Sequence, residues 1–212
     1  MPRSSASRAR LGALCLAVAG ILFVLYPAIR PFSDETTLEG AKAFASNAWI
    51  VAHVLAMLGF ILLSLGVLGA YGHLKQGPGD RPTALAVVLS WTGAGLTLPY
   101  YGAEAFGLHA IGHEAVRQHN PALVHLAAEV RNGPGLILFA PGLLMLGIGA
   151  IVLGAAVWRS GILPRWSGVP FALGFALYIP QFFGNQPIRV AHGLLVAAGC
   201  LWLATGIWRS PG

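Results

Sequence analysis

The chain has 212 residues, of which 56% are hydrophobic and only 9% charged, and its mean hydropathy is +0.71. Soluble domains carry about 25% charged residues, so this composition argues against an ordinary soluble fold. It also excludes a disordered chain, which would be poor in apolar residues. The composition indicates an integral membrane protein.

Apolar residues occur in blocks of about twenty, the length that a helix needs to cross a bilayer. We therefore expect an all-α, polytopic membrane protein with six transmembrane helices in one bundle. The expected spans are residues 11–29, 48–71, 83–107, 135–158, 166–184 and 188–208. The segments between them are too short for a separate soluble domain, so residues 1–212 are expected to form a single membrane domain.

The first span follows several arginines, as the apolar part of a secretory signal would. It ends Leu25-Tyr26-Pro27-Ala28-Ile29 and offers no small-x-small cleavage site. We expect it to be an uncleaved first helix.

The charged residues predict the orientation of the chain. If the spans alternate in direction, one side carries a single acid, Asp80, and most of the basic residues: Arg3, Arg8, Arg10, Lys75, Arg81, Arg159, Arg165 and Arg209. The positive-inside rule then places both termini in the cytoplasm. The net charge of +6 is read as this topology signal, and no nucleic-acid partner is expected. The high alanine, glycine and arginine content is typical of a GC-rich bacterial genome, which predicts a multi-pass protein of the bacterial inner membrane.

Short sequence similarities between spans suggest an internal repeat. The second span begins with Val51-Ala52-His53 and the sixth with Val190-Ala191-His192, while Tyr26-Pro27 and Tyr178-Ile179-Pro180 end the first and fifth. These matches predict three related helical hairpins inserted in the same direction.

Glu104 is the most informative single residue, because apolar and aromatic side chains surround it in the third span. A carboxylate there costs about 2.5–3.5 kcal/mol on insertion scales and is a functional candidate by default. We expect Glu104 to act as a general acid, with Tyr100 and Tyr101 positioning a substrate. The alternative is an ion pair with Arg131 or Arg189, or a side chain that extends to the membrane interface.

His53 and His192 are expected at the same depth on two different helices. They are candidates for a catalytic base or for the two axial ligands of a b-type haem, with outer arginines such as Arg30, Arg131 or Arg189 near its propionates. The alternative is that each histidine forms a hydrogen bond with a neighbouring helix.

Segment 108–134 is predicted to be an outer loop with a short interfacial helix. Asn120-Pro121 favours a helix start and Asn132-Gly133-Pro134 a stop. His109 and His113 are four residues apart on the expected extension of the third span, as are His125 and Glu129 on the interfacial helix, and together these four could bind zinc or iron. The alternative is that all four are solvated.

Polar residues gather on the outer side, whereas the inner halves of the spans are almost wholly apolar, which argues against a channel. We therefore expect an outward-facing pocket of histidine, glutamate and aromatic residues covered by 108–134. The leading hypothesis is a membrane-embedded enzyme that uses acid–base or metal-assisted chemistry on a lipid or isoprenoid substrate. The alternatives are a non-catalytic haem- or metal-binding protein, or a partner or assembly subunit without a small-molecule ligand.

Overall fold

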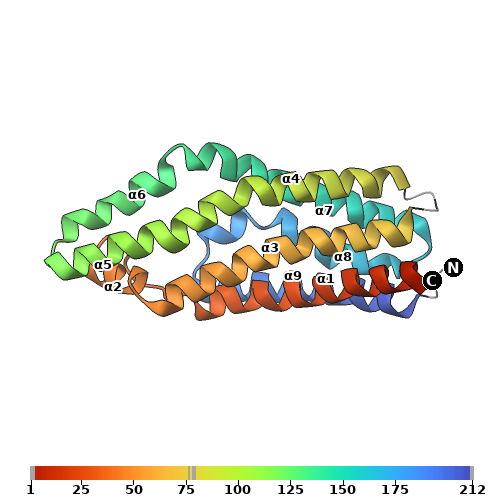
Figure 1. Cartoon of the computed structure of the whole chain (residues 1–212), viewed down its shortest axis with the longest axis horizontal. Helices are drawn as coiled ribbons and strands as arrows, with labels where there is room; N and C mark the ends of the chain where they lie inside the picture. Colours follow the sequence, from red (N-terminus) through yellow and green to blue (C-terminus); the bar gives the residue numbers. More distant parts are fainter. Residues whose placement is uncertain (1–2, 76, 78–79, 211–212) are drawn as a thin grey trace.

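The computed structural model describes residues 3–75, 77 and 80–210, and this part of the chain is helical without strands (Figure 1). The α-helices are α1 (Arg3–Ile29), α2 (Leu38–Phe44), α3 (Asn47–Leu74), α4 (Asp80–Gly102), α5 (Leu108–Gln118), α6 (His125–Asn132), α7 (Gly135–Ser160), α8 (Gly168–Ala176) and α9 (Gln186–Arg209). A π-helix (Ala103–Gly107) joins α4 to α5, and short 3₁₀ helices cover Pro121–Val124, Arg165–Ser167 and Pro180–Phe183. The expected all-α fold is confirmed.

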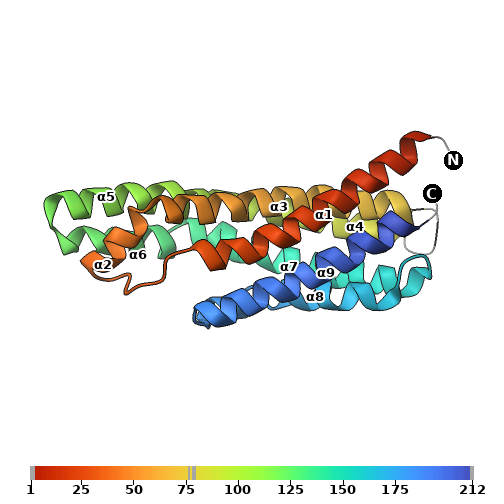
Figure 2. The same cartoon turned by 90° about the horizontal axis from the view of Figure 1, so that it is seen from below.

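The long helices and the shorter α8 pack side by side in a ring. Helix α1 packs against α3 and α9, α4 against α3 and α7, and α8 against α7 and α9 (Figures 1 and 2). Glycines allow the closest approaches: a Cβ built on Gly12 of α1 would lie 2.5 Å from the Cα of Gly69 of α3. Backbones this close favour helix association through van der Waals contacts, as in membrane proteins.

Four helices are long and apolar enough to cross a membrane: Ser7–Ile29, Asn47–Leu74, Gly135–Ser160 and Gln186–Arg209. They contain the predicted spans 11–29, 48–71, 135–158 and 188–208. A membrane protein is therefore supported.

The other two predicted spans do not qualify, so the expectation of six such helices is corrected to four within the described residues. Span 83–107 is helical, but its threonines, glycines and tyrosines lower its hydropathy. Span 166–184 is not one helix, because α8 ends at Ala176 and a turn precedes the 3₁₀ helix that begins at Pro180. Proline has no N–H to donate and restricts the residue before it, which interrupts an α-helix.

The apolar interior is divided into two clusters. The main one runs between the long helices and contains Phe23, Phe60, Leu146 and Phe175. The second lies at the end of the molecule opposite the termini, where α2, α5, the 3₁₀ helix Pro121–Val124 and α6 pack together (Figure 1). We call these four helices the cap. The buried residues of this second cluster are Ala41, Phe44, Leu108, Ala115, Val124 and Ala127 of the cap and Trp49 of α3.

Helix α4, the π-helix and α5 form one continuous helix that links the long helices to the cap (Figure 1). The π-helix follows Pro99 by about one turn. Single π turns inside α-helices occur frequently at functional sites. This one contains Glu104, whose backbone carbonyl accepts a hydrogen bond of 2.7 Å from Nε1 of Trp49 in α3.

Candidate functional site: a buried charge cluster beneath the cap

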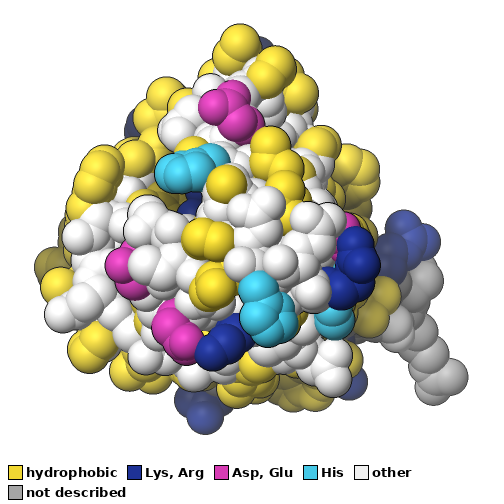
Figure 3. Space-filling model, turned by 90° about the vertical axis from the view of Figure 1, so that its left-hand side faces the viewer, with side chains coloured by type: hydrophobic (Ala, Val, Ile, Leu, Met, Phe, Trp, Pro, Cys, Tyr) yellow, Lys and Arg dark blue, Asp and Glu magenta, His cyan; other side chains and the backbone are white. Residues whose placement is uncertain are grey.

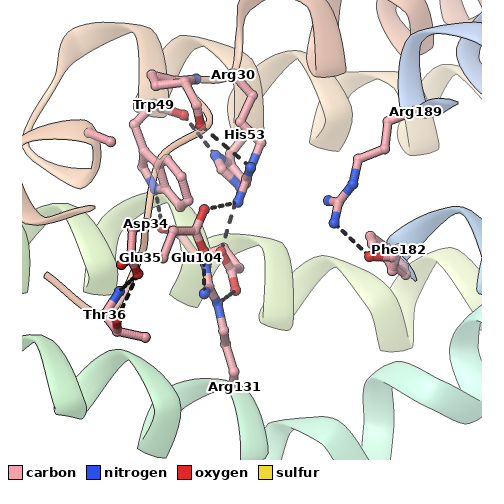
Figure 4. A network of polar contacts seen from close by, with 12 residues as sticks. Arg30, Asp34, Glu35, Thr36, Trp49, His53, Glu104, Arg131, Phe182 and Arg189 are labelled. Atoms are coloured by element: carbon pink, nitrogen blue, oxygen red, sulfur yellow. Dashed lines mark hydrogen bonds and ion pairs between the residues drawn. The ribbon is translucent and has the colours of Figure 1, made fainter. Parts of the chain in front are cut away.

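Five ionisable side chains from separate segments meet between the cap and the main apolar core (Figure 4). They are Arg30 just after α1, Glu35 in the following loop, His53 in α3, Glu104 in the π-helix and Arg131 near the end of α6. Charged groups buried this deeply are costly unless they are paired.

Arg131 is the centre of the cluster. Its Nε and Nη2 donate to Oε1 and Oε2 of Glu104 at 2.6 and 3.0 Å, and its Nη1 donates to Oε2 of Glu35 at 2.5 Å. The arginine therefore connects α6 to the π-helix and to the loop after α1. A guanidinium that pairs with a carboxylate through two parallel bonds fixes geometry as well as charge.

Arg30 is the more deeply buried of the two arginines of the cluster, with 6% of its surface exposed. Its Nη2 donates to Oε1 of Glu35 at 2.6 Å, and its guanidinium lies over the rings of Trp49 and Phe32, 4.5 and 4.7 Å from their centroids. Its Nε is buried and has no hydrogen-bond partner among the described residues. Arg30 thus retains one unsatisfied donor inside the protein.

His53 is buried against the same carboxylate. Its Nδ1 is 2.7 Å from the carbonyl of Trp49, one turn earlier in α3, and its Nε2 is 3.7 Å from Oε2 of Glu104. The first distance is a hydrogen bond. The second is a close electrostatic approach without one.

The pairing shifts the pKa values of the cluster residues outside the long apolar helices. Burial raises the pKa of Glu35, but the charges and hydrogen bonds of Arg30 and Arg131 lower it more, so that the net pKa lies below its ordinary value. Burial lowers the pKa of Arg131, and the bonds from Glu104 and Glu35 more than reverse this effect. Both pKa shifts favour the charged form of the residue, because each charge is stabilised by its partners in the cluster.

Arg189 of α9 lies apart from this cluster (Figure 4). It donates from Nε to the carbonyl of Gly184 at 3.0 Å and from Nη2 to that of Phe182 at 2.6 Å. Its guanidinium is 5.4 Å from the centroid of Phe32, the ring that Arg30 also contacts. None of the described carboxylates forms an ion pair with this half-buried cation.

A small pocket adjoins Arg189 and has room for about one water molecule. It is lined by Phe23, Tyr26, Pro27, Tyr178, Gln181, Arg189 and His192. The pocket can admit a few atoms of a polar group but not a whole lipid or a porphyrin.

The structure does not bring His53 and His192 together. Tyr26 packs on His53 and Tyr178 on His192, with ring centroids 5.4 and 5.2 Å apart, and Tyr101 contacts both tyrosines. Nε2 of His192 is 2.7 Å from the carbonyl of Gly174 in the neighbouring helix α8. The alternative of a hydrogen bond to a neighbouring helix therefore fits His192, whereas the hydrogen bond of His53 is to its own helix α3.

The two predicted positioning tyrosines have different surroundings. Tyr101 is buried, with its hydroxyl 3.3 Å from that of Tyr178. Tyr100 is stacked on Phe139, and its hydroxyl donates to the carbonyl of Arg131 at 3.3 Å. Tyr100 therefore contacts the backbone of Arg131, and the ring of Tyr101 lies 6.1 Å from that of His53, so that both tyrosines border the charge cluster.

The predicted metal ligands are not assembled into a site. No group of three or more His, Cys, Asp or Glu side chains among the described residues is placed to hold a metal ion. Nδ1 of His109 is 2.9 Å from the carbonyl of Phe44, whereas His113, His125 and Glu129 are exposed. The i,i+4 spacing placed each pair on one face of its helix, but the two pairs do not converge. Viewed from the cap end, charged and histidine side chains are scattered among hydrophobic ones (Figure 3).

Sequence reasoning selected Glu104, His53 and Arg131, and it named Arg131 as a possible ion-pair partner of Glu104. It missed Glu35 and Trp49 as members of the site. Glu35 lies in a polar loop, where acids are common, and Trp49 resembles an ordinary interfacial aromatic residue. Arg30 was easier to notice, because its charge stands next to the end of an apolar span.

Comparisons with protein-family models, with curated proteins and with solved structures found no match.

Proposed function

We propose that the chain crosses the membrane six times. The connectivity supports this, because α3 ends at the terminal end of the molecule and α7 begins near the cap (Figure 1). If both span the bilayer, the chain between them must cross back, and α4 is the segment that runs in that direction. The same reasoning applies to residues 161–185, between α7 and α9. Each added crossing packs between spanning helices, so its polar groups need not face lipid.

We propose that the termini lie in the cytoplasm of a bacterial cell and that the cap lies outside the inner membrane. The support is the concentration of basic residues at the terminal end. We also propose three related hairpins, α1 with α3, α4 with α7 and α8 with α9, on the strength of the short sequence similarities between spans; the two helices of each pair are in contact.

For the function, we propose that the cap-side site binds the acidic head of a hydrophobic ligand. The observation that carries this proposal is Arg189, a half-buried cation without an ion-pair partner among the described side chains. Arg30, on the same Phe32 ring, is paired with Glu35 but adds a buried donor, its Nε, without a partner among the described residues. Such groups are stabilised by an anion.

The surroundings of Arg189 suit an amphipathic ligand. The adjoining pocket accepts only a few polar atoms, with Tyr26, Gln181 and His192 in its wall. Nearby, Phe183 is 90% exposed and Ile188 is 53% exposed. A carboxylate or phosphate would occupy the polar recess, while its hydrocarbon chain would extend along this apolar surface in the bilayer.

The test uses the purified protein in phosphatidylcholine nanodiscs with three probes of equal chain length: a fatty acid, an alkyl phosphate and an alkyl alcohol. We expect the acidic probes to bind and the alcohol to bind much more weakly. Arg189→Gln should weaken the binding of the acidic probes by about tenfold, the value of one charge-assisted hydrogen bond. Arg117→Gln is the matched control, because Arg117 is an exposed cap arginine paired with Glu114. Equal binding of the alcohol, or equal losses in both variants, would reject the proposal.

Acid–base catalysis on a lipid or isoprenoid is the second candidate. It is favoured by two features of Glu104: this residue lies in a π-helix, and its Oε2 is 3.7 Å from Nε2 of His53 in α3. Because both oxygens of Glu104 are bonded to Arg131, the cap would have to move before a substrate could reach this carboxylate. Mass spectrometry of isoprenyl phosphates and phospholipids incubated with the protein should show conversion that Glu104→Gln abolishes. Absent conversion would leave ligand binding as the function, and conversion retained by a folded Glu104→Gln variant would exclude Glu104 as the catalytic acid.

A further inference from the structure

A groove of about 450 Å³ lies at the end of the molecule opposite the cap. It is formed by the loop after α7, residues 161–164, and by the last two turns of α9. This volume is in the range of ligand pockets in general. The groove is far from the charge cluster, at the opposite end of the long helices.

The α9 wall of the groove changes from apolar at Trp202 to polar at Thr205, Arg209 and Ser210. The loop wall contributes the apolar Ile162 and Leu163, and Leu163 lies beside Gly206. Seven residues of α-helix separate Trp202 from Arg209, which corresponds to about 10 Å along the helix axis. With α9 across the bilayer, the apolar part faces the acyl chains and Arg209 lies at the headgroups.

This end of the molecule is strongly basic. Arg159, Arg165 and Arg209 are exposed, and none of them has an ion-pair partner among the side chains that the structure describes. The C-termini of α7 and α9 contribute about half a negative charge each. The three arginines outweigh this contribution, so the groove attracts anions.

The aromatic residues of this end also suit a membrane interface. Trp158 packs edge-on against Trp166 at 4.7 Å between ring centroids, and Arg165 lies 5.6 Å from the centroid of Trp158. Arg10 lies 5.7 Å from the centroid of Trp208. Tryptophan and arginine together are typical of the headgroup level of a bilayer.

We propose that this groove binds one anionic phospholipid, with its phosphate at Arg209 and the start of an acyl chain over Trp202. Basic pockets between helices on the cytoplasmic side are suited to such lipids. The inference rests on the membrane placement proposed above and is independent of the ligand proposed for Arg189. A free phosphate ion would use only the polar half of the groove and leave the apolar half empty.

The test is native mass spectrometry of the delipidated protein in neutral detergent, with phosphatidylglycerol or phosphatidylcholine added. We expect one phosphatidylglycerol to be retained in preference to phosphatidylcholine. Arg209→Gln should weaken the retention of phosphatidylglycerol by about fivefold, as expected for one basic residue at an anionic headgroup. Thr205→Trp, which fills the groove without removing a charge, should weaken it as well.

Arg159→Gln is the matched control, because Arg159 is exposed at the same end but does not line the groove. It should retain the lipid as the wild type does. Equal losses in Arg159→Gln and Arg209→Gln would show general charge attraction and overturn the proposal. Retention without preference for phosphatidylglycerol, full retention by Thr205→Trp, or displacement of the lipid by millimolar inorganic phosphate would overturn it too.

Discussion

Glu104 and Arg131 join the π-helix to the end of α6 through two parallel hydrogen bonds of 2.6 and 3.0 Å. These bonds attach the last helix of the cap to the helix that passes beneath it. Glu104 is largely buried, whereas a quarter of the Arg131 side chain remains exposed. The pair is therefore a structural connection as well as a candidate site.

Removing one member of this pair should destabilise the protein. Glu104→Gln leaves Arg131 without its main partner, and Arg131→Gln leaves Glu104 without an arginine partner and Glu35 with Arg30 alone. Each variant should lose about 3 kcal/mol of unfolding free energy, the lower end for breaking a buried ion pair. Thermal unfolding in detergent measures the loss. Glu129→Gln, an exposed change in the same helix, should unfold like the wild type, and an equal loss there would contradict the explanation.

Glu35 should make stability depend on pH. Its pKa is lower in the folded protein than in the unfolded chain, so its ionised form stabilises the fold at neutral pH. That contribution is lost as the pH falls from about 4.3, the unfolded value, through the lower folded value. Glu35→Gln should therefore flatten the acid limb of a plot of melting temperature against pH.

The matched control for this experiment is Glu39→Gln. Glu39 is exposed on α2 and pairs only with the exposed Lys42. Its substitution should leave the acid limb unchanged. If Glu35→Gln leaves the slope as it is in the wild type, the ion pairs of Glu35 do not stabilise the fold.

Two tryptophans allow a matched comparison of buried and exposed hydrogen bonds. Trp49 donates to the carbonyl of Glu104 at 2.7 Å and is fully buried, while Trp91 donates to the carbonyl of Ser64 at 2.9 Å and is 48% exposed. Trp49→Phe should cost about 2 kcal/mol, because it leaves a buried carbonyl unsatisfied. Trp91→Phe should cost less than half as much. Equal losses of unfolding free energy would show that the hydrogen bond of Trp49 to the π-helix stabilises the fold no more than the exposed bond of Trp91 does.

Two glycines of α4 test the close approach of α4 and α7. A Cβ at Gly93 would lie 2.6 Å from the carbonyl oxygen of Gly142, whereas a Cβ at Gly95 would meet no described atom within 4 Å. Gly93→Ala should destabilise the protein by about 1–3 kcal/mol through overpacking. Gly95→Ala should be neutral or slightly stabilising. Similar melting temperatures for the two variants would mean that the helices can separate at little cost.

The helical class and the membrane environment could be predicted from hydropathy, because apolar blocks of about twenty residues match the thickness of a bilayer core. The prediction was wrong for 83–107 and 166–184, because neither range forms a helix apolar enough to count as a membrane span by itself. In the first, the polar residues include Thr97, which is buried against Gly142 and so need not face lipid. In the second, Pro180 interrupts the helix, and its effect on a buried segment cannot be read from the mean hydropathy of a window.

The site could be predicted only where a residue conflicts with its local surroundings. Glu104 was recognisable because a carboxylate among aromatic and apolar residues is unusual. Glu35 and Arg131 are 96 positions apart, and their contact depends on how the cap folds over the ends of the long helices. Helical periodicity carries no information on such a contact, and it likewise could not show that the faces bearing His109 and His125 do not converge.

The charged layer beneath the cap separates two apolar cores that share no buried residue. Water can solvate the arginines and glutamates of this layer if it opens, whereas opening either apolar core would expose hydrocarbon. We therefore expect the molecule to open first at this level. In hydrogen exchange, the amides of the cap should then exchange together, as a foldon, before those of the long helices below.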